Sequence, residues 1–309
     1  FDVSFGGKTE VPSVGILMME NIGGEEDEFW TRGITEDLIV KIAGAGLIRV
    51  APMEEIIRIS DLSLSIKEKA KTLDVKYLLT SSLHKKDDQF DLRCQLIEVA
   101  SGNSKYANKW SEPIDKAPTI VGNLADNLLK ALKVSSKQDI VKVPTSKTEA
   151  YKYYLEANYI YDKSKNMKDI ELTKGLLEKA IELDSSLIIA KNKLGNVVRY
   201  SGDSHGAMEI YSEIVRQSKM IGDKHNAATA LNSIGSLLWR KGNYDQALDN
   251  FQQSLKLYNE VEDNNGIARS LRYIGLVYYA KGDYDEDLVY MEKSIKLIEG
   301  ILVIDEKDK

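Results

Sequence analysis

Residues 228–258 read ATALNSIGSLLWRKGNYDQALDNFQQSLKLY, with apolar side chains three or four positions apart on both sides of Gly242-Asn243. Apolar residues at this spacing indicate an amphipathic helix, and a Gly-Asn pair is typical of a turn. The stretch therefore predicts two helices, at 228–240 and 244–258, that fold back on each other.

The same pattern recurs at a fixed distance along the chain. Leu-Gly or Ile-Gly pairs at 194–195, 234–235 and 274–275 lie 40 residues apart, and turn glycines follow at the same spacing, at 202, 242 and 282. A more divergent unit runs from about 149 to 184. Because about three stacked units are needed for a stable array, we predict an all-α solenoid of about four repeats over 148–309.

The glycine of each Leu-Gly or Ile-Gly pair lies inside a predicted helix, where glycine costs roughly 1 kcal/mol relative to alanine. A glycine there lets a second helix approach closely, and Ala207 and Ala247 follow two of these glycines by 12 residues. We therefore expect a close helix contact at each glycine. Asp287 occupies the matching alanine position of the last repeat.

These recurring positions resemble the tetratricopeptide repeat, in which a bulky residue, Leu-Gly, an aromatic residue, alanine and a second aromatic residue follow one another at fixed places. They are filled in one unit by Leu231, Ile234, Gly235, Leu238, Ala247 and Phe251, and in the next by Leu271, Ile274, Gly275, Tyr278 and Met291. The period of 40 is similar to that of the longer repeats in kinesin light chains. The resemblance implies a tetratricopeptide-repeat solenoid that presents a groove to a partner.

In such a solenoid, the first helix of each repeat lines the concave groove. The resemblance implies that the partner-binding residues are Asn192, Asn196, Arg199, Asn232, Ser236, Trp239, Arg269, Arg272 and Tyr279. Asparagine bonds both N–H and C=O of a peptide backbone, and arginine holds a carboxylate by two bonds. We predict that the groove binds a protein or an extended peptide, with an acidic peptide as one option. The alternative is that these are ordinary solvated side chains.

The first 134 residues alternate between two kinds of element. Strands are expected at 13–19, 47–51, 77–84, 90–98 and 104–110, and helices at 28–43, 65–73 and 119–132. This alternation, with two hairpin turns, predicts an α/β domain with a mixed sheet over 12–134. The polar stretch 135–147 is predicted as an exposed linker, and 1–11 as a leader or linker.

Several stretches of this half carry a second resemblance. They are Glu20-Asn21, Phe29-Trp30, 33–38, 73–79 and 95–102, and they resemble the TolB-like amino-terminal domain found beside tetratricopeptide repeats in bacterial signalling proteins. The whole arrangement is similar to the carboxy-terminal regions of bacterial class III adenylate cyclases and of some serine/threonine kinases. The resemblance implies a non-catalytic regulatory or sensor region, cut from a longer protein whose catalytic domain precedes Phe1.

The composition limits the classes of function. The 309 residues are 43% hydrophobic and 29% charged, which suits about two domains and provides no apolar run long enough to cross a bilayer. A net charge of −6 weighs against nucleic acid as a partner. The lone Cys94 is expected in the core. We expect a soluble segment of a bacterial protein, on the cytoplasmic or periplasmic face of the membrane, with the compartment left open.

The sequence shows no motif for catalysis, a cofactor or a metal. Gly23-Gly24 lacks the GxGxxG spacing of a dinucleotide site, and 283–287 lacks the glycine that a calcium loop needs next. We therefore expect that this chain alone is not an enzyme and holds neither a cofactor nor a metal. Two alternatives stay open. One is a small-ligand or nucleotide sensor with its ligand near residues 21–24, and the other is a self-association scaffold that forms a homodimer.

Overall fold

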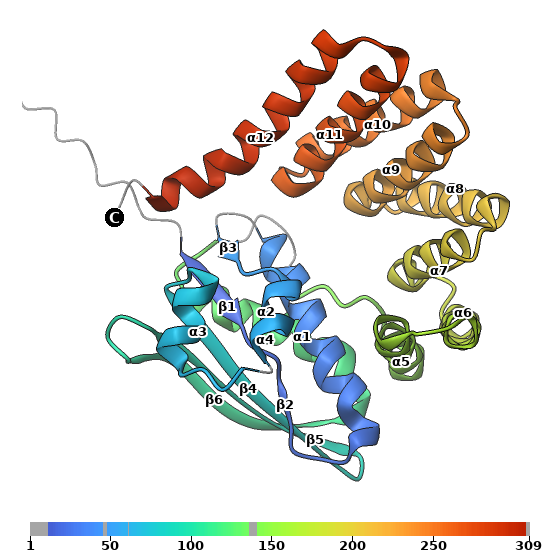
Figure 1. Ribbon diagram of the computed structural model, residues 1–309. Helices are drawn as coiled ribbons and strands as arrows, with labels where there is room; N and C mark the ends of the chain where they lie inside the picture. The colour runs from blue at the N-terminus through green and yellow to red at the C-terminus, as the bar shows by residue number, and fades with distance from the viewer. Residues whose placement is uncertain (1–11, 46–47, 61, 136–140, 307–309) are drawn as a thin grey trace, which may run out of the picture.

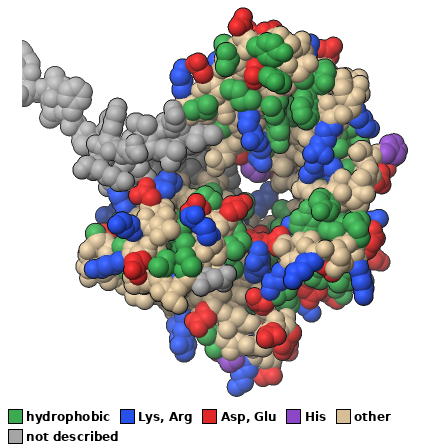
Figure 2. Space-filling model, in the orientation of Figure 1, with side chains coloured by type: hydrophobic (Ala, Val, Ile, Leu, Met, Phe, Trp, Pro, Cys, Tyr) green, Lys and Arg blue, Asp and Glu red, His purple; other side chains and the backbone are tan. Residues whose placement is uncertain are grey.

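The computed structural model describes residues 12–45, 48–60, 62–135 and 141–306, with side chains described up to residue 297. A mixed α/β unit comes first and a run of eight helices follows it (Figure 1). The predicted leader, 1–11, lies outside the described residues. On the face drawn in Figure 2, basic side chains are interspersed with acidic ones.

The sheet of the α/β unit has the order β3-β1-β4-β5-β6, with β2 pairing β4 beyond the end of β1. Strand β1 is parallel to β3 and β4, whereas β4, β5 and β6 form an antiparallel meander. The mixed sheet is therefore confirmed. The strand bounds are β1 Ser13–Ile16, β2 Glu20–Asn21, β3 Arg49–Val50, β4 Tyr77–Lys86, β5 Gln89–Glu98 and β6 Ser104–Pro113.

Four α-helices accompany this sheet: α1 Glu28–Ala43, α2 Met53–Ser60, α3 Ile66–Leu73 and α4 Ala117–Ala131. Helix α1 lies against the meander, since the buried ring of Trp30 meets the ring of Phe90 of β5 edge-on with centroids 5.1 Å apart. The ring of Phe29, next to Trp30 in α1, lies 5.0 Å from it. Helix α3 covers the other side of β1, because the side chain of its Leu73 would lie 2.9 Å from a Cβ on Gly15. Layers on both sides explain why β1 is buried along its whole length.

The second half consists of four antiparallel helix pairs, which confirms the predicted all-α solenoid. Glycines with φ of +94°, +79° and +82° make the turns at Gly202, Gly242 and Gly282. The helices are α5 Thr148–Lys163, α6 Met167–Leu183, α7 Ile188–Tyr200, α8 Ser204–Met220, α9 Lys224–Arg240, α10 Tyr244–Glu260, α11 Asn264–Lys281 and α12 Tyr284–Glu306.

The glycines inside the first helices make the close contacts that their spacing predicts. A Cβ atom on Gly195 would lie 2.5 Å from the ring of Tyr211, and one on Gly235 would lie 2.6 Å from the ring of Phe251. Both rings belong to the second helix of the same repeat and are buried. An aromatic ring therefore lies directly on the backbone of each of these glycines.

The last repeat departs from this arrangement at Asp287. A Cβ on Gly275 would meet Oδ1 of Asp287 at 2.9 Å, and this oxygen is buried without a hydrogen-bond partner in the described part of the chain. The equivalent Ala207 and Ala247 are fully buried. The last repeat thus keeps an unsatisfied acceptor where its neighbours have a methyl group.

We expect Asp287→Ala to stabilise the protein by about 1 kcal/mol, because a buried acceptor without a partner costs roughly 1 to 3 kcal/mol. Part of this gain is lost, since a carboxylate near the start of α12 interacts favourably with the helix dipole. Urea denaturation followed by circular dichroism measures the change. Asp285→Ala, an exposed carboxylate in the same turn, is the control and should lower stability slightly. A lower midpoint for Asp287→Ala would contradict this reading of the last repeat.

The α/β unit and the solenoid pack directly against each other through α1 and α5. The side chain of Leu155 fills the space beside Gly33, where a Cβ would lie 2.6 Å from it. One hydrophobic core runs from the sheet through this contact into α9. The predicted linker is not exposed throughout, since Thr145 is buried and its hydroxyl donates to Asp184.

Polar groups flank the same contact. The Tyr151 hydroxyl donates to Oδ2 of Asp37 at 2.5 Å, and Arg32 of α1 pairs with Asp162 of α5 at 3.0 Å. Burial raises the pKa of Asp37 to about 6, although the hydrogen bond from Tyr151 acts in the opposite direction. Burial, and then the carboxylate of Asp162, raise the pKa of Glu36. The seam between the two units therefore holds carboxyl groups that ionise with difficulty.

Candidate functional site

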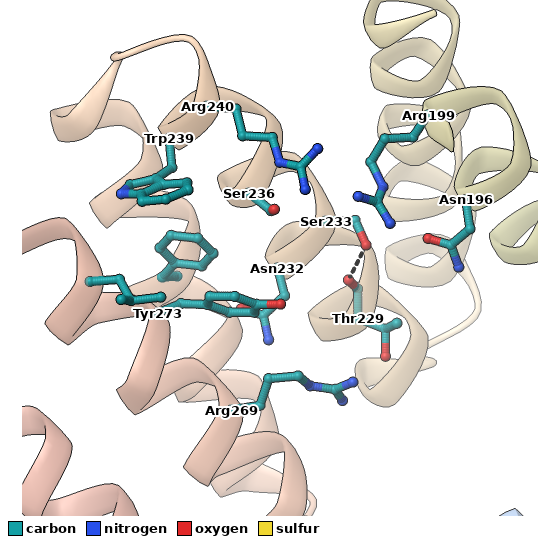
Figure 3. A pocket seen from close by; sticks show the side chains of 12 residues that line it. Asn196, Arg199, Thr229, Asn232, Ser233, Ser236, Trp239, Arg240, Arg269 and Tyr273 are labelled. Atoms are coloured by element: carbon teal, nitrogen blue, oxygen red, sulfur yellow. Dashed lines mark hydrogen bonds between the residues drawn. The ribbon is translucent and has the colours of Figure 1, made fainter. Parts of the chain in front are cut away.

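The first helices of three successive repeats enclose a pocket of about 350 Å³ (Figure 3). Helix α7 supplies two of the lining residues, α9 six, α10 one and α11 three. They are Asn196, Arg199, Thr229, Asn232, Ser233, Ser236, Trp239, Arg240, Phe251, Arg269, Tyr273 and Leu276.

The structure brings six of the nine predicted groove residues into this pocket: Asn196, Arg199, Asn232, Ser236, Trp239 and Arg269. The other three lie outside its lining. The amide of Asn192 donates to Asn226 at 3.1 Å, and the guanidinium of Arg272 lies 5.5 Å from the ring centre of Tyr273. Tyr279 is 59% exposed and packs edge-on against Tyr284.

The pocket is positively charged. Its lining includes three guanidinium groups, those of Arg199, Arg240 and Arg269, and no carboxylate. Within the described ranges, none of the three forms an ion pair with an acidic side chain. Arg269 donates to the Tyr258 hydroxyl at 3.2 Å, which fixes its stem beside the pocket. A carboxylate entering the pocket would meet three cations, of which Arg269 also interacts electrostatically with the nearby carboxylate of Asp263.

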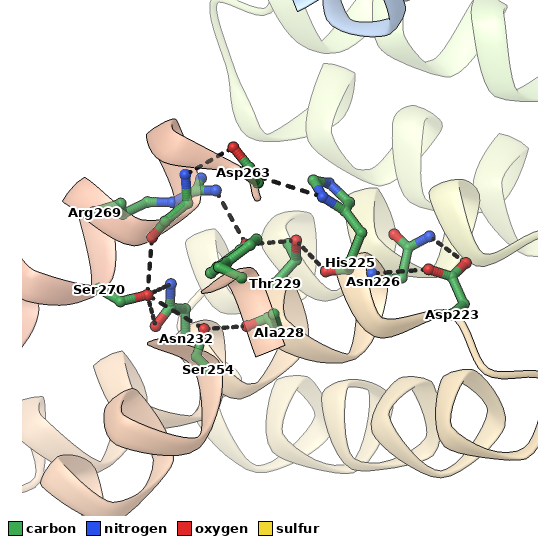
Figure 4. Close-up of polar contacts among 12 residues, drawn as sticks. Asp223, His225, Asn226, Ala228, Thr229, Asn232, Ser254, Asp263, Arg269 and Ser270 are labelled. Carbon is green, nitrogen blue, oxygen red and sulfur yellow. Dashed lines mark hydrogen bonds and ion pairs between the residues drawn. The ribbon is translucent and has the colours of Figure 1, made fainter. Parts of the chain in front are cut away.

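Asn232 forms part of the pocket floor and is paired inside the protein (Figure 4). Its Nδ2 donates to Oγ of Ser270 at 3.0 Å, and Ser254 in turn donates to the carbonyl of Ala228 at 2.8 Å. Only 4% of Asn232 is exposed. The expectation that this amide bonds a peptide backbone is therefore corrected: the side chain joins α9 to α11 and shapes the floor.

Trp239 adds an unused hydrogen-bond donor. Its Nε1 is buried and has no acceptor among the described residues. Beside it, the ring of Phe251 stacks on that of Tyr273 with centroids 4.9 Å apart. A buried donor without an acceptor costs roughly 1 to 3 kcal/mol. Because this nitrogen is itself buried, a ligand in the pocket cannot reach it without movement of the surrounding side chains.

Sequence reasoning missed half of the lining, including Arg240 and Tyr273. Arg240 follows Ser236 by four positions, and Tyr273 follows Arg269 by four, so each lies on the same helix face as its predecessor. The prediction instead advanced by three on α11, from Arg269 to Arg272. A spacing of four, applied from Ser236 on α9 and from Arg269 on α11, would have predicted both residues.

The alternative ligand site near residues 21–24 is a closed turn. The side chain of Asn21 donates to the carbonyl of Gly24 at 2.7 Å and accepts from the amide of Gly23 at 3.0 Å. Asp27, just beyond, pairs with Lys85 at 3.2 Å. The polar groups of this turn are therefore largely paired with one another.

Three further observations concern the chemistry of the chain. Cys94 lies in the core, as predicted, and burial raises the pKa of its thiol to about 11. Among the described residues, no three His, Cys, Asp or Glu side chains are placed to hold a metal ion together. None of the described helices combines the length and the apolar character needed to span a bilayer.

Comparison with known proteins identifies the repeats. The family model of the tetratricopeptide repeat matches residues 186–260 and 226–299. The chain is also 20% identical over 124 residues to a curated protein of Rhizobium meliloti (strain 1021) named "Putative adenylate cyclase 3". That match covers 40% of this chain, and the chain spans about a fifth (21%) of the relative's length.

Two solved structures are similar to the chain. The crystal structure of BtubC (BKLC) from P. vanneervenii is 17% identical, with 61% of this chain and 74% of that chain covered at a TM-score of 0.44. The apo form of RapI is 14% identical, with 60% and 65% covered at a TM-score of 0.44. The repeat match and the sheet topology by themselves describe an α/β domain with a mixed sheet followed by a solenoid of tetratricopeptide repeats, a fold of protein–protein interaction.

Proposed function

We propose that this chain is a non-catalytic regulatory or sensor region of a bacterial signalling protein, an adenylate cyclase, and that it recruits an acidic protein segment through the pocket of Figure 3. The observation that carries the proposal is a repeat groove with three guanidinium groups and no lining carboxylate. Similarity to the Rhizobium protein supports the cyclase context. The TolB-like character of residues 12–134 is part of the same proposal and rests on the stretches quoted above.

The binding mode follows from the side chains of the pocket. Arg199 on α7 and Arg240 on α9 both point into it (Figure 3), so one Asp or Glu side chain can accept from two guanidinium groups. The stacked rings of Phe251 and Tyr273 supply an apolar wall. Charged donors fix the position of the acidic group, and the rings add buried apolar area.

Arg240→Glu should weaken binding of an acidic peptide by about thirtyfold, which corresponds to about 2 kcal/mol for a lost charge-assisted contact. Arg240 is exposed at the end of α9 and has no hydrogen-bond or ion-pair partner in the described residues, so its replacement should leave the fold intact. Fluorescence anisotropy measures the affinity, with ten-residue peptides selected on the intact chain from a display library.

Arg272→Glu is the matched control, because it makes the same charge change at an exposed arginine of α11 outside the pocket. We expect this variant to bind within a factor of about three of the unchanged chain, the difference being long-range electrostatics that salt screens. Circular dichroism verifies that both variants are folded. Equal losses for Arg240→Glu and Arg272→Glu, or a selected library without enriched Asp and Glu, would refute the pocket as the binding site.

A further inference from the structure

The outer surface of α12 carries an exposed apolar stripe. Tyr284, Leu288 and Ile295 are 59%, 61% and 51% exposed, and their spacing of four and seven places them on one helix face. In Figure 2, hydrophobic side chains gather at the top of the view, over the start of this helix. Such a stripe on the surface of a monomer marks a site of interaction.

The preceding repeat shows what kind of element covers this stripe. Tyr244, Leu248 and Leu255 of α10 stand 40 residues before the three exposed side chains, and they are partly buried in a cluster with Ile274 and Val277 of α11. Helix α11 runs antiparallel to α10 because only a short turn joins them. The surface of α12 is thus the surface of α10 without its covering antiparallel helix.

We propose that α12 of a second copy of this chain covers the stripe, in an antiparallel pair about a two-fold axis. A two-fold axis across the helix produces the antiparallel arrangement that already covers α10, and each stripe serves as the cover of the other. The interface extends the stacking of the solenoid across two chains. It is independent of the groove and therefore of the function proposed above.

Charge placement favours the second copy and the antiparallel direction. Asp285, near the start of α12, and Lys296, near its middle, are 11 residues apart, which puts them on the same side of the stripe. In an antiparallel pair Asp285 faces Lys296 of the second copy, whereas a parallel two-fold pair would place the two on opposite sides of the interface, where they do not meet. The side chain of Lys296 is 73% exposed and pairs with Glu292 of its own helix at 3.0 Å.

Sedimentation equilibrium of the full 309-residue chain tests the interface. We expect a monomer–dimer equilibrium in the micromolar range, and Leu288→Glu should raise the dissociation constant at least about thirtyfold, since the dimer buries two copies of the substituted side chain. Leu172→Glu, at a leucine of α6 that is 53% exposed, should leave the dimer unchanged. A monomer at every concentration, or equal dimerisation of the unchanged chain and Leu288→Glu, would overturn the proposal.

A charge exchange tests the antiparallel direction. Asp285→Lys alone and Lys296→Asp alone should each weaken self-association, because each places like charges in both symmetry-related contacts. An equimolar mixture of the two variants should associate as well as the unchanged chain, since every contact then joins opposite charges. Circular dichroism controls for helix content. Failure of the mixture to recover association, with both variants folded, would overturn the antiparallel pairing.

Discussion

Gly235→Val should destabilise the protein by about 3 kcal/mol, among the largest effects of any single substitution in the repeats. The added methyl groups would extend from a Cβ that lies 2.6 Å from the ring of Phe251, and this ring is only 1% exposed. The ring cannot retreat without disturbing its stack on Tyr273. Overpacking of a filled core typically costs 1 to 3 kcal/mol, and the slightly better helix propensity of valine over glycine offsets only a small part of that cost.

Gly175→Ala is the control for this substitution. Gly175 also lies inside a helix, α6, but nothing lies within 4 Å of a Cβ built there. Alanine at this position should stabilise the protein by up to about 1 kcal/mol through helix propensity alone. Urea denaturation of both variants measures the two changes, which must have opposite signs. A destabilised Gly175→Ala, or a Gly235→Val variant as stable as the unchanged chain, would refute the packing account.

Asp37→Asn should stabilise the protein by about 2 kcal/mol at pH 8 and have little effect at pH 4. The folded-state pKa of Asp37, about 6, is higher than the value of roughly 3.9 for an unfolded chain. The unfolded state therefore releases this proton first as pH rises, and stability is lost between about pH 4 and pH 7. Asparagine carries no charge, so it removes this cost while still accepting from the Tyr151 hydroxyl.

The measurement is the free energy of unfolding in urea at several pH values. Asp126→Asn is the control, since this carboxylate lies on the outer side of α4 and pairs with Lys130 in solvent. The difference between Asp37→Asn and the unchanged chain should grow with pH and level off above about pH 7, whereas the control difference should not grow in this way. A constant difference across the whole range would contradict a buried Asp37 with a raised pKa.

The fold was largely predictable because its main signal is local. The 40-residue period repeats glycines and aromatic residues within single helix pairs, and each pair repeats the same contact, as Gly235 does with Phe251. Helix α2, Met53–Ser60, was not predicted, whereas α3, which is equally short, was; α3 starts with a capping box of Ser65 and Glu68. The contact between Gly33 and Leu155 could not be predicted either, since the two residues are 122 positions apart and no pattern links them.

The candidate site was predictable only to the level of the helices that line it. The sequence placed Arg199, Trp239 and Arg269 on first helices, and these residues do line one pocket. Which side of α11 faces that pocket depends on how the helix is rotated against α9, and this rotation selects Tyr273 instead of Arg272. Likewise, Asn232 is paired by Ser270, a residue 38 positions later, and only the three-dimensional stack brings the two together.

The seam between α1 and α5 has a consequence for how such proteins are assembled from parts. Leu155 fills the space beside Gly33, and Arg32 pairs with Asp162. The first repeat helix, α5, therefore packs on the α/β unit as well as on the rest of the solenoid. A chimera that joins this α/β unit to a foreign solenoid would have to carry α5 with it. The part that must be transferred as one piece is then the α/β unit together with α5, and only the repeats beyond α5 can be exchanged.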